Sequence, residues 1–264
     1  MADHSHNRRA WDQRVKQGGR FTRPAEDETF VDPLQQIDGY GWLGGDIRGR
    51  RVLCLAAGGG RQSALYAAAG GIVTVVDISP AMLELDREVA AERKLDVRTV
   101  EASMDDLSMF ANGEFDLVIH PVSTCYVPAI EPVYREVARV TRDGGIYISQ
   151  HKTPTSLQAD VQVSSRGYEL IEPYYRQGPL PPVVGSRHRE EGTLEFLHRW
   201  EEIIGLMCRS GFVIEDLVEP RHADLEAALS TFGHRSRYVA PYVRIKARRT
   251  GSSQAATSKL VLVT

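Results

Sequence analysis

The sequence predicts an α/β fold in which strands and helices alternate along the chain. Short apolar runs of strand length, as at 51–56 and 72–76, recur between segments whose apolar residues have helical spacing. Such strand–helix–strand units build a parallel sheet with helices on both faces. The turn Gly58-Gly59-Gly60 follows the first of these runs and Asp77 follows the second. The fold class is therefore predicted together with a ligand site at one edge of the sheet.

Composition and charge exclude several other classes of protein. The 264 residues include 32 Lys+Arg against 35 Asp+Glu, and the net charge of −3 argues against a protein that binds nucleic-acid phosphates. The N-terminus lacks the apolar core of a secretory signal, and no apolar run approaches the ~18 residues of a membrane span. The three cysteines are widely spaced and form no disulfide framework or zinc motif. We expect a cytoplasmic protein with no metal site and no membrane or nucleic-acid partner.

The first half of the chain supplies the elements around the glycine-rich turn. Trp11 and Val15 are separated by one helical turn, which predicts a short amphipathic helix over 6–17. An Ala-rich stretch over 61–69 favours a helix after the turn. Ser79 and the proline after it start another helix, because Ser caps a helix N-terminus and Pro suits the first helical position.

The second half continues the alternation and interrupts it once. Apolar residues over 130–140 recur at i, i+3, i+4 and i+7, the pattern of a helix that packs on a sheet. The stretch 152–193 is instead rich in Pro and Tyr and has no regular period. A helix is predicted again over 195–209. The remaining strands are predicted at 97–100, 115–119, 146–149, 213–218 and 238–246.

The glycine-rich turn has the properties of a nucleotide-type site. Glycine and alanine allow a ligand to approach the backbone closely, and the N–H groups of the next helix face it. Asp77 lies one helix and one strand further on, where an acid accepts both hydroxyls of a ribose. Two cofactors fit this pattern. Gly58, Gly60 and Ser63 form a loose dinucleotide motif, and S-adenosylmethionine is the alternative.

The order of the later segments separates these cofactors. The segments Phe115-Asp-Leu-Val-Ile119, Val140-Thr-Arg-Asp-Gly-Gly-Ile146 and Ser210-Gly-Phe-Val213 follow one another at fairly specific spacing. In this order the chain resembles class I S-adenosylmethionine-dependent methyltransferases of the small-molecule, UbiE-like type. The resemblance covers about 45–150 and resumes at about 194–247.

This resemblance implies a fold and a domain organisation. The family has a Rossmann-like, seven-stranded, mostly parallel sheet with helices on both faces, and its last strand is antiparallel. The chain would then be a single domain with an N-terminal lid and an insertion after the fifth strand that caps the substrate. The parts would be a lid at 1–45, a core at 46–151 and 194–248, a substrate cap at 152–193 and a tail at 249–264.

The resemblance also assigns residues to S-adenosylmethionine. Asp77 would hold the ribose, Ser103 would lie at the adenine edge, and His120 would face the methyl group. The chain departs from the family at Cys54 and Ser103, where relatives often have acids, and at Ala56, where they have glycine. The expected cofactor-binding residues are Ala56, Ala57, Gly58, Gly60, Asp77, Ile78, Ser103, Met104, His120, Pro121 and Val122.

Methyl transfer needs in-line alignment of the acceptor, and some acceptors also need a base. His120, after the fourth strand, is the first candidate for the base, although it could instead hydrogen-bond the cofactor or a loop. Tyr126 could orient the substrate or simply pack. His198, on the predicted helix at 195–209, is either structural or turned toward the substrate. Trp11 and Thr22 belong to the expected lid.

We therefore expect methyl transfer from S-adenosylmethionine to a small-molecule acceptor, with S-adenosylhomocysteine as the product. One alternative is an NAD(P)-dependent oxidoreductase, which is disfavoured because some 50 residues precede the glycine turn and the turn starts two residues late with Ala56-Ala57. The other alternative is a non-catalytic protein that keeps the fold and binds the cofactor. The sequence does not indicate the oligomeric state.

Overall fold

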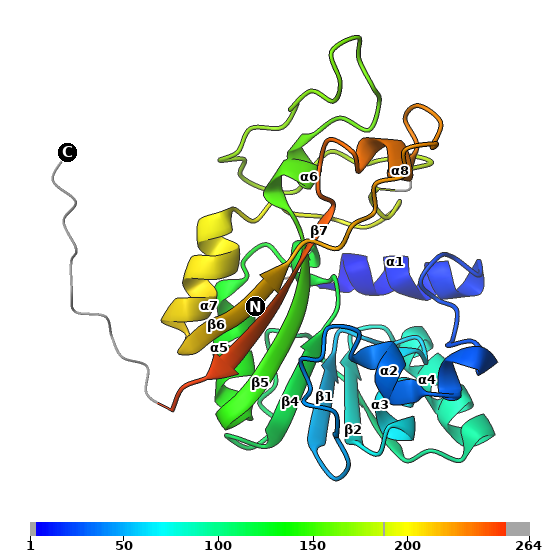
Figure 1. Cartoon of the computed structure of the whole chain (residues 1–264), viewed down its shortest axis with the longest axis vertical. Helices are drawn as coiled ribbons and strands as arrows, with labels where there is room; N and C mark the ends of the chain where they lie inside the picture. Colours follow the sequence, from blue (N-terminus) through cyan, green and yellow to red (C-terminus); the bar gives the residue numbers. More distant parts are fainter. Residues whose placement is uncertain (1–3, 187, 252–264) are drawn as a thin grey trace, which may run out of the picture.

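The computed structural model describes residues 4–186 and 188–251, which contain a seven-stranded sheet flanked by helices (Figure 1). The expected tail at 249–264 therefore lies outside the described residues beyond position 251. The strands are β1 Arg51–Leu55, β2 Ile72–Asp77, β3 Val97–Glu101, β4 Phe115–His120, β5 Thr141–Lys152, β6 Phe212–Val218 and β7 Tyr242–Arg249. The α-helices are α1 Ser5–Lys16, α2 Pro33–Ile37, α3 Gln62–Ala68, α4 Pro80–Arg93, α5 Glu131–Val140, α6 Pro154–Gln158, α7 Leu206–Arg209 and α8 Phe232–Arg235. Shorter helical turns are η1 Asp27–Phe30, η2 Thr124–Tyr126 and η3 Glu201–Gly205, of which η3 is a π-helix.

The strand order is β3-β2-β1-β4-β5-β7-β6, with β1 to β5 parallel and β7 antiparallel to both of its neighbours. The predicted seven-stranded fold with an antiparallel last strand is confirmed. The chain moves outward from β1 in both directions, to β2 on one side and to β4 on the other. Ligands bind at such a switch point, outside the carboxyl ends of the strands. The glycine-rich turn follows β1 and lies at this edge.

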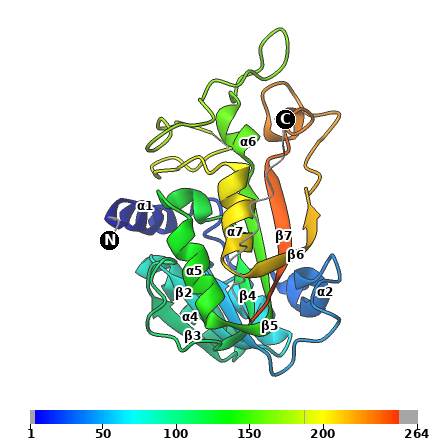
Figure 2. The ribbon, with the colours of Figure 1, turned by 90° about the vertical axis from the view of Figure 1, so that its left-hand side faces the viewer.

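Two apolar layers hold the helices against the sheet. On one face, Tyr134 of α5 and Met207 of α7 pack with Leu53 and Val118 of the strands. Figure 2 shows α5 and α7 side by side on this face. On the other face, Tyr66 of α3 and its neighbours from α4 cover the opposite side chains of β1 and β2. Strands buried on both faces explain the continuous apolar runs in the sequence.

The predicted helix over 195–209 is wrong at its start. Residues 195–199 are not helical, and the helical backbone begins at Trp200. The backbone hydrogen bonds of the first residues go elsewhere, because the Phe196 N–H donates to the Cys125 carbonyl at 2.7 Å and the Glu195 carbonyl accepts from the Leu180 N–H at 2.7 Å. His198 therefore lies on a loop rather than on a helix.

Two strand boundaries also differ from the prediction. β5 begins at Thr141 instead of 146, and it contains Gly144 in a left-handed conformation where its pairing with β4 shifts register. β7 begins at Tyr242 instead of 238, directly after Pro241. Proline has no N–H to donate to a neighbouring strand, which is why it suits a position before the strand.

The segment between β6 and β7 joins the insertion after β5. We name residues 153–199 and 219–241 together the upper lobe, which stands above the carboxyl ends of the parallel strands in Figure 1. The Arg235 guanidinium donates to the carbonyls of Ser156, Ala159 and Asp160, at 2.8, 2.8 and 2.9 Å. The Tyr168 hydroxyl and His234 Nδ1 are 2.8 Å apart. The sequence pattern did not predict that two separate segments form one lobe.

Candidate functional site

The glycine-rich turn packs closely against α4. A Cβ added at Gly58 would lie 2.7 Å from the Met82 Cβ, and one added at Gly60 would lie 2.8 Å from the Leu85 carbonyl oxygen. Gly60 also has a φ of +71°, which larger residues rarely adopt. Ala56 adopts a φ of +47° at the start of the turn. The close packing explains why glycine stands at positions 58 and 60.

Asp77 connects the ends of β1 and β2. Its Oδ2 accepts the Gly58 N–H at 2.9 Å, and its Oδ1 accepts the Ser79 N–H at 2.9 Å. Burial raises the pKa of this carboxyl group to about 6, although these backbone N–H groups oppose the shift. A carboxylate offers about four lone-pair sites, so Asp77 can accept two more hydrogen bonds when it is ionised. This is the capacity that a ribose diol requires.

A second buried acid, Asp86, supports the turn and was missed by the sequence analysis. Its carboxylate accepts the Gly59 N–H at 2.9 Å, the Gly60 N–H at 3.1 Å and the Ser63 hydroxyl. Burial raises the pKa of Asp86 to about 6. Asp86 lies on α4 one turn after Met82, on the helix face that the apolar residues define. The sequence signal that could have identified Asp86 was an acid on a helix face that is otherwise apolar.

Helix α1 covers the carboxyl edge of the sheet. Figure 1 shows it crossing between the strand ends and the upper lobe. Asp12 of α1 accepts the Ser79 hydroxyl at 2.6 Å, and Arg8 forms an ion pair of 2.7 Å with Glu101. Asn7 donates to the carbonyls of Tyr126 and Leu194, at 2.9 and 3.0 Å. The helix is thus attached both to the sheet and to the upper lobe.

The two residues predicted for the lid lie on or after α1. Trp11 packs edge-on against Tyr126, with ring centroids 5.7 Å apart. Thr22 is buried, and its hydroxyl donates to the Gly19 carbonyl at 2.7 Å, which closes a tight turn. The carbonyl oxygen of the intervening Phe21 would lie 3.4 Å from a Cβ at Gly59. The segment after α1 therefore passes over the glycine-rich turn.

The other residues predicted to bind the cofactor are gathered at the same edge. Ser103 follows β3, which lies next to β2 in the sheet, and the Ala102 N–H donates to the Asp77 carbonyl at 3.1 Å. Val122 follows β4 and packs with the apolar cluster that includes Trp11. The remaining predicted residues at this edge are the buried Ala57 and the half-buried Ile78, Met104 and Pro121.

His120 ends β4 in a fully buried position. Its Nδ1 is 2.8 Å from the Tyr147 hydroxyl, whereas its Nε2 has no hydrogen-bond partner among the described residues. Burial lowers the pKa of His120 to about 3, so the imidazole is neutral near pH 7. A buried nitrogen without a partner is costly, and such groups mark sites that a ligand or water completes.

Tyr126 and His198 both have hydrogen-bond partners within the protein. The Tyr126 hydroxyl donates to Glu190 Oε2 at 2.9 Å, and burial raises the pKa of this hydroxyl. His198 Nε2 lies 2.9 Å from the Thr124 carbonyl and 3.0 Å from the Val127 carbonyl, so it donates to the loop after β4. His198 therefore holds the loop in which Tyr126 lies.

A buried group of charged residues lies behind Tyr126. Lys152 Nζ is 2.6 Å from Glu190 Oε2 and also pairs with Glu195, which in turn pairs with Arg189. Burying charges is costly unless each has a partner, and in this group two cations balance two anions. The sequence analysis missed this group, because Lys152 ends β5 and both acids lie some 40 residues later.

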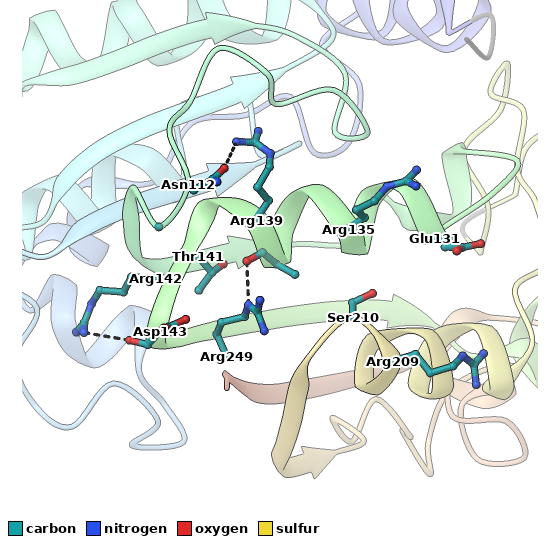
Figure 3. A pocket seen from close by; sticks show the side chains of 12 residues that line it. Asn112, Glu131, Arg135, Arg139, Thr141, Arg142, Asp143, Arg209, Ser210 and Arg249 are labelled. Carbon is teal, nitrogen blue, oxygen red and sulfur yellow. Dashed lines mark hydrogen bonds between the residues drawn. The ribbon is translucent and has the colours of Figure 1, made fainter. Parts of the chain in front are cut away.

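A cavity of about 850 Å³ lies at the other edge of the sheet, near the start of β5 (Figure 3). Several arginines line it, but they contact neighbouring groups of the protein. Arg249 donates to the Ala138 carbonyl at 3.0 Å, and Arg139 donates to the Leu107 and Phe110 carbonyls. These arginines satisfy carbonyls at a helix end and in a loop, which is a structural role.

A second cavity, about 510 Å³, lies between α1 and the upper lobe. Arg14 and Arg20 come from the N-terminal region, Arg189 and Glu190 from the insertion, and Phe232 from α8. Glu190 connects this cavity to the loop after β4 through its hydrogen bond with Tyr126. In the described part of the chain, no group of three or more His, Cys, Asp or Glu residues is placed to hold a metal ion. No helix there is both long enough and apolar enough to cross a membrane.

Comparisons with known proteins agree with this geometry. Residues 53–149 match the family model of a methyltransferase domain. The chain is 34% identical over 232 residues to the uncharacterized methyltransferase YbaJ of Bacillus subtilis (strain 168), and the match covers 82% of this chain and 90% of that protein. The fold is similar to a putative S-adenosylmethionine-dependent methyltransferase from Listeria monocytogenes, with TM-score 0.62, 18% identity, and coverage of 78% and 92% of the two chains. It is also similar to geranyl diphosphate C-methyltransferase from Streptomyces coelicolor A3(2), solved with S-adenosyl-L-homocysteine, with TM-score 0.61, 17% identity, and coverage of 95% and 99%.

Proposed function

The chain belongs to the class I S-adenosylmethionine-dependent methyltransferases, and from this premise we propose that it methylates a small-molecule acceptor at the carboxyl edge of its sheet. The observation that carries this location is the hydrogen bond from the Gly58 N–H to Asp77 at the switch point between β1 and β4. It places the acid beside the backbone that a nucleoside must approach. The acceptor is expected in the adjoining space below the upper lobe.

We propose that the cofactor binds between the glycine-rich turn, α1 and the loop after β4. The donor set fits this ligand, because Asp77 retains acceptor sites for two hydroxyls and His120 Nε2 lacks a partner among the described residues. The cofactor contacts proposed for the turn are those of Ala56, Ala57, Gly58 and Gly60. The adenine contacts are those of Ile78, Ser103 and Met104, and the methionine-end contacts are those of His120, Pro121 and Val122.

The protein's part in the reaction is alignment and exclusion of water. The bound cofactor supplies both the methyl group and the leaving sulfur. Trp11 and Tyr126 close the space between α1 and the loop after β4, which keeps water from the reacting atoms. A pKa of about 3 makes His120 a weak base at neutral pH. We therefore assign His120 the alternative role of a hydrogen-bonding group that orients the acceptor or the cofactor.

We further propose that residues 1–45 act as a lid and 152–193 as a substrate cap on a core formed by 46–151 and 194–248. The hydrogen bonds of Asn7 to the Tyr126 carbonyl of the core and of Arg14 to the Glu191 carbonyl of the insertion support the lid. The contacts of Arg235 extend the cap to the segment before β7. A cytoplasmic location is also proposed, and the free thiols of Cys54, Cys125 and Cys208 agree with it.

Calorimetric titration with S-adenosylhomocysteine and with NAD tests the cofactor site. The wild-type chain is expected to bind S-adenosylhomocysteine and not NAD. Asp77→Ala should weaken S-adenosylhomocysteine binding at least about 100-fold, since it removes two charge-assisted hydrogen bonds. Asp143→Ala, an exposed acid at the other edge, is the control and should leave the affinity unchanged.

Unchanged affinity in Asp77→Ala would remove this residue from the site. A separate assay follows methyl transfer from labelled S-adenosylmethionine to a panel of small metabolites. Binding of S-adenosylhomocysteine without transfer to any member of a broad panel would favour the non-catalytic alternative.

A further inference from the structure

The cavity of about 510 Å³ between α1 and the upper lobe has an unusual charge distribution. Its wall includes the three arginines Arg14, Arg20 and Arg189 and the single acid Glu190. Three separate parts of the chain meet here, namely the N-terminal region, the insertion and α8. These are the parts that differ from the common core of the sheet, so this is where an acceptor would be distinguished.

Two of the three guanidinium groups carry charge that no acid among the described residues balances. Arg189 pairs with Glu195, and Glu190 pairs with Lys152, so these four groups neutralise one another. Neither Arg14 nor Arg20 forms an ion pair within the described residues. Arg14 Nη1 donates only to the Glu191 carbonyl at 3.3 Å, and its buried Nε has no partner there.

Arg20 is held by aromatic rings instead of a carboxylate. Its guanidinium lies 4.8 Å from the Phe21 ring centroid and 6.0 Å from that of Phe232. Such cation–π contacts fix the guanidinium while leaving its N–H groups free to donate. His188 lies beside Phe232, with ring centroids 5.5 Å apart, and its pKa is lowered to about 4, chiefly by burial and further by nearby positive charges that include Arg20. The positive charge of Arg20 therefore lies at the wall of this cavity.

We propose that the methyl acceptor is a small aromatic or apolar molecule with a carboxylate or phosphate group, which Arg14 and Arg20 bind. Guanidinium groups match both anions in geometry, and the rings of Phe21 and Phe232 suit an apolar body. This inference rests on the proposed function, because it places the acceptor beside the cofactor site. Two contacts connect this cavity to the proposed cofactor site. The Phe21 carbonyl lies next to Gly59 of the glycine-rich turn, and the Tyr126 hydroxyl donates a hydrogen bond to Glu190 in the cavity wall.

The test compares anionic and neutral probes on the full chain saturated with S-adenosylhomocysteine. The matched pair is 4-hydroxybenzoate and 4-hydroxybenzamide, and phenyl phosphate is the second anion. Calorimetry should show that an anionic probe binds at least about 10-fold more tightly than the amide, the value of one charge-assisted hydrogen bond. Tighter binding of 4-hydroxybenzoate assigns a carboxylate, and tighter binding of phenyl phosphate assigns a phosphate. Either result supports the proposal.

The double variant Arg14→Gln with Arg20→Gln should lose this preference while it keeps its affinity for S-adenosylhomocysteine. Arg166→Gln is the control, because it removes a positive charge from an exposed side chain of the insertion. It should behave as the wild-type chain does.

Three results would overturn the proposal. They are equal or absent binding of the anionic and neutral probes to the wild-type chain, a preference that persists in the double variant, and loss of S-adenosylhomocysteine affinity in that variant. The last would mean that the arginines bind the cofactor's own carboxylate. Failure of the wild-type chain to bind S-adenosylhomocysteine at all would instead overturn the proposed function.

Discussion

The two edges of the sheet use polar residues in different ways. At the edge near the start of β5, arginines line the larger cavity, and Arg139 and Arg249 donate to carbonyl groups there. At the carboxyl edge, His120 Nε2 and Arg14 Nε lack partners among the described residues, and Asp77 retains acceptor capacity. The larger cavity is therefore the less promising site. Unsatisfied hydrogen-bonding capacity, rather than volume or the number of arginines, distinguishes the edge that we propose binds the cofactor.

The largest expected effect comes from a matched pair of aspartates, one at each edge. Asp86→Ala should cost about 3 kcal/mol in the free energy of unfolding, because it leaves two buried glycine N–H groups and the Ser63 hydroxyl without an acceptor. It should also weaken S-adenosylhomocysteine binding. Asp116→Ala should cost only about 1 kcal/mol, because the Arg51 N–H and the Arg142 side chain it bonds are partly exposed.

Urea unfolding and calorimetry measure both quantities. Equal losses of stability in the two variants, with cofactor affinity unchanged in each, would contradict the distinction between the edges.

An intermediate effect is expected from pH. Burial raises the pKa of Asp77 to about 6, and only the ionised carboxylate accepts both hydroxyls of a ribose. Affinity for S-adenosylhomocysteine should therefore fall below pH 6, by up to about 10-fold per pH unit. The effect on the ligand-free fold has the opposite sign. A raised folded-state pKa contributes stability that is present below the unfolded value of 3.8 and is lost as the pH rises through 6.

Calorimetry between pH 5 and 8 on the wild-type chain and Asp77→Asn checks this prediction. The variant should bind weakly with a shallower profile over this range, since Asp86 still titrates near pH 6. An equally steep profile in the variant would assign the titration to another group.

The smallest effect on stability is expected at His120. In His120→Phe the buried Nε2 without a partner is removed, but the Tyr147 hydroxyl loses its hydrogen bond with Nδ1, so the two effects oppose each other. Stability should stay within about 1 kcal/mol of the wild-type value, although methyl transfer should fall. Urea unfolding compared with transfer from labelled S-adenosylmethionine measures both. A loss of several kcal/mol without a change in transfer would make His120 a structural residue.

Much of the fold could be predicted because its signals are local. The alternation of apolar runs fixes strands and helices, and the glycine-rich turn with Asp77 is set by one strand, one helix and the next strand. Asp86 was missed although its position on an apolar helix face was visible. The helix predicted over 195–209 failed at its start because pairing with Cys125 and Leu180 replaced the local hydrogen bonds. Apolar spacing alone does not reveal that hydrogen bonds to distant segments compete with those of a helix.

The sequence by itself determined the order of the elements, the glycine-rich turn and the acid beside it. These features depend on backbone stereochemistry and on periodicity within short segments. Only the tertiary structure decided which charges are balanced. It joined Lys152 to Glu190 and Glu195, attached α1 to the upper lobe, and left Arg14 and Arg20 without an acidic partner in the part of the chain that the structure describes. Burial and pairing depend on residues distant in sequence, so the character of the proposed acceptor site emerges only when the segments meet.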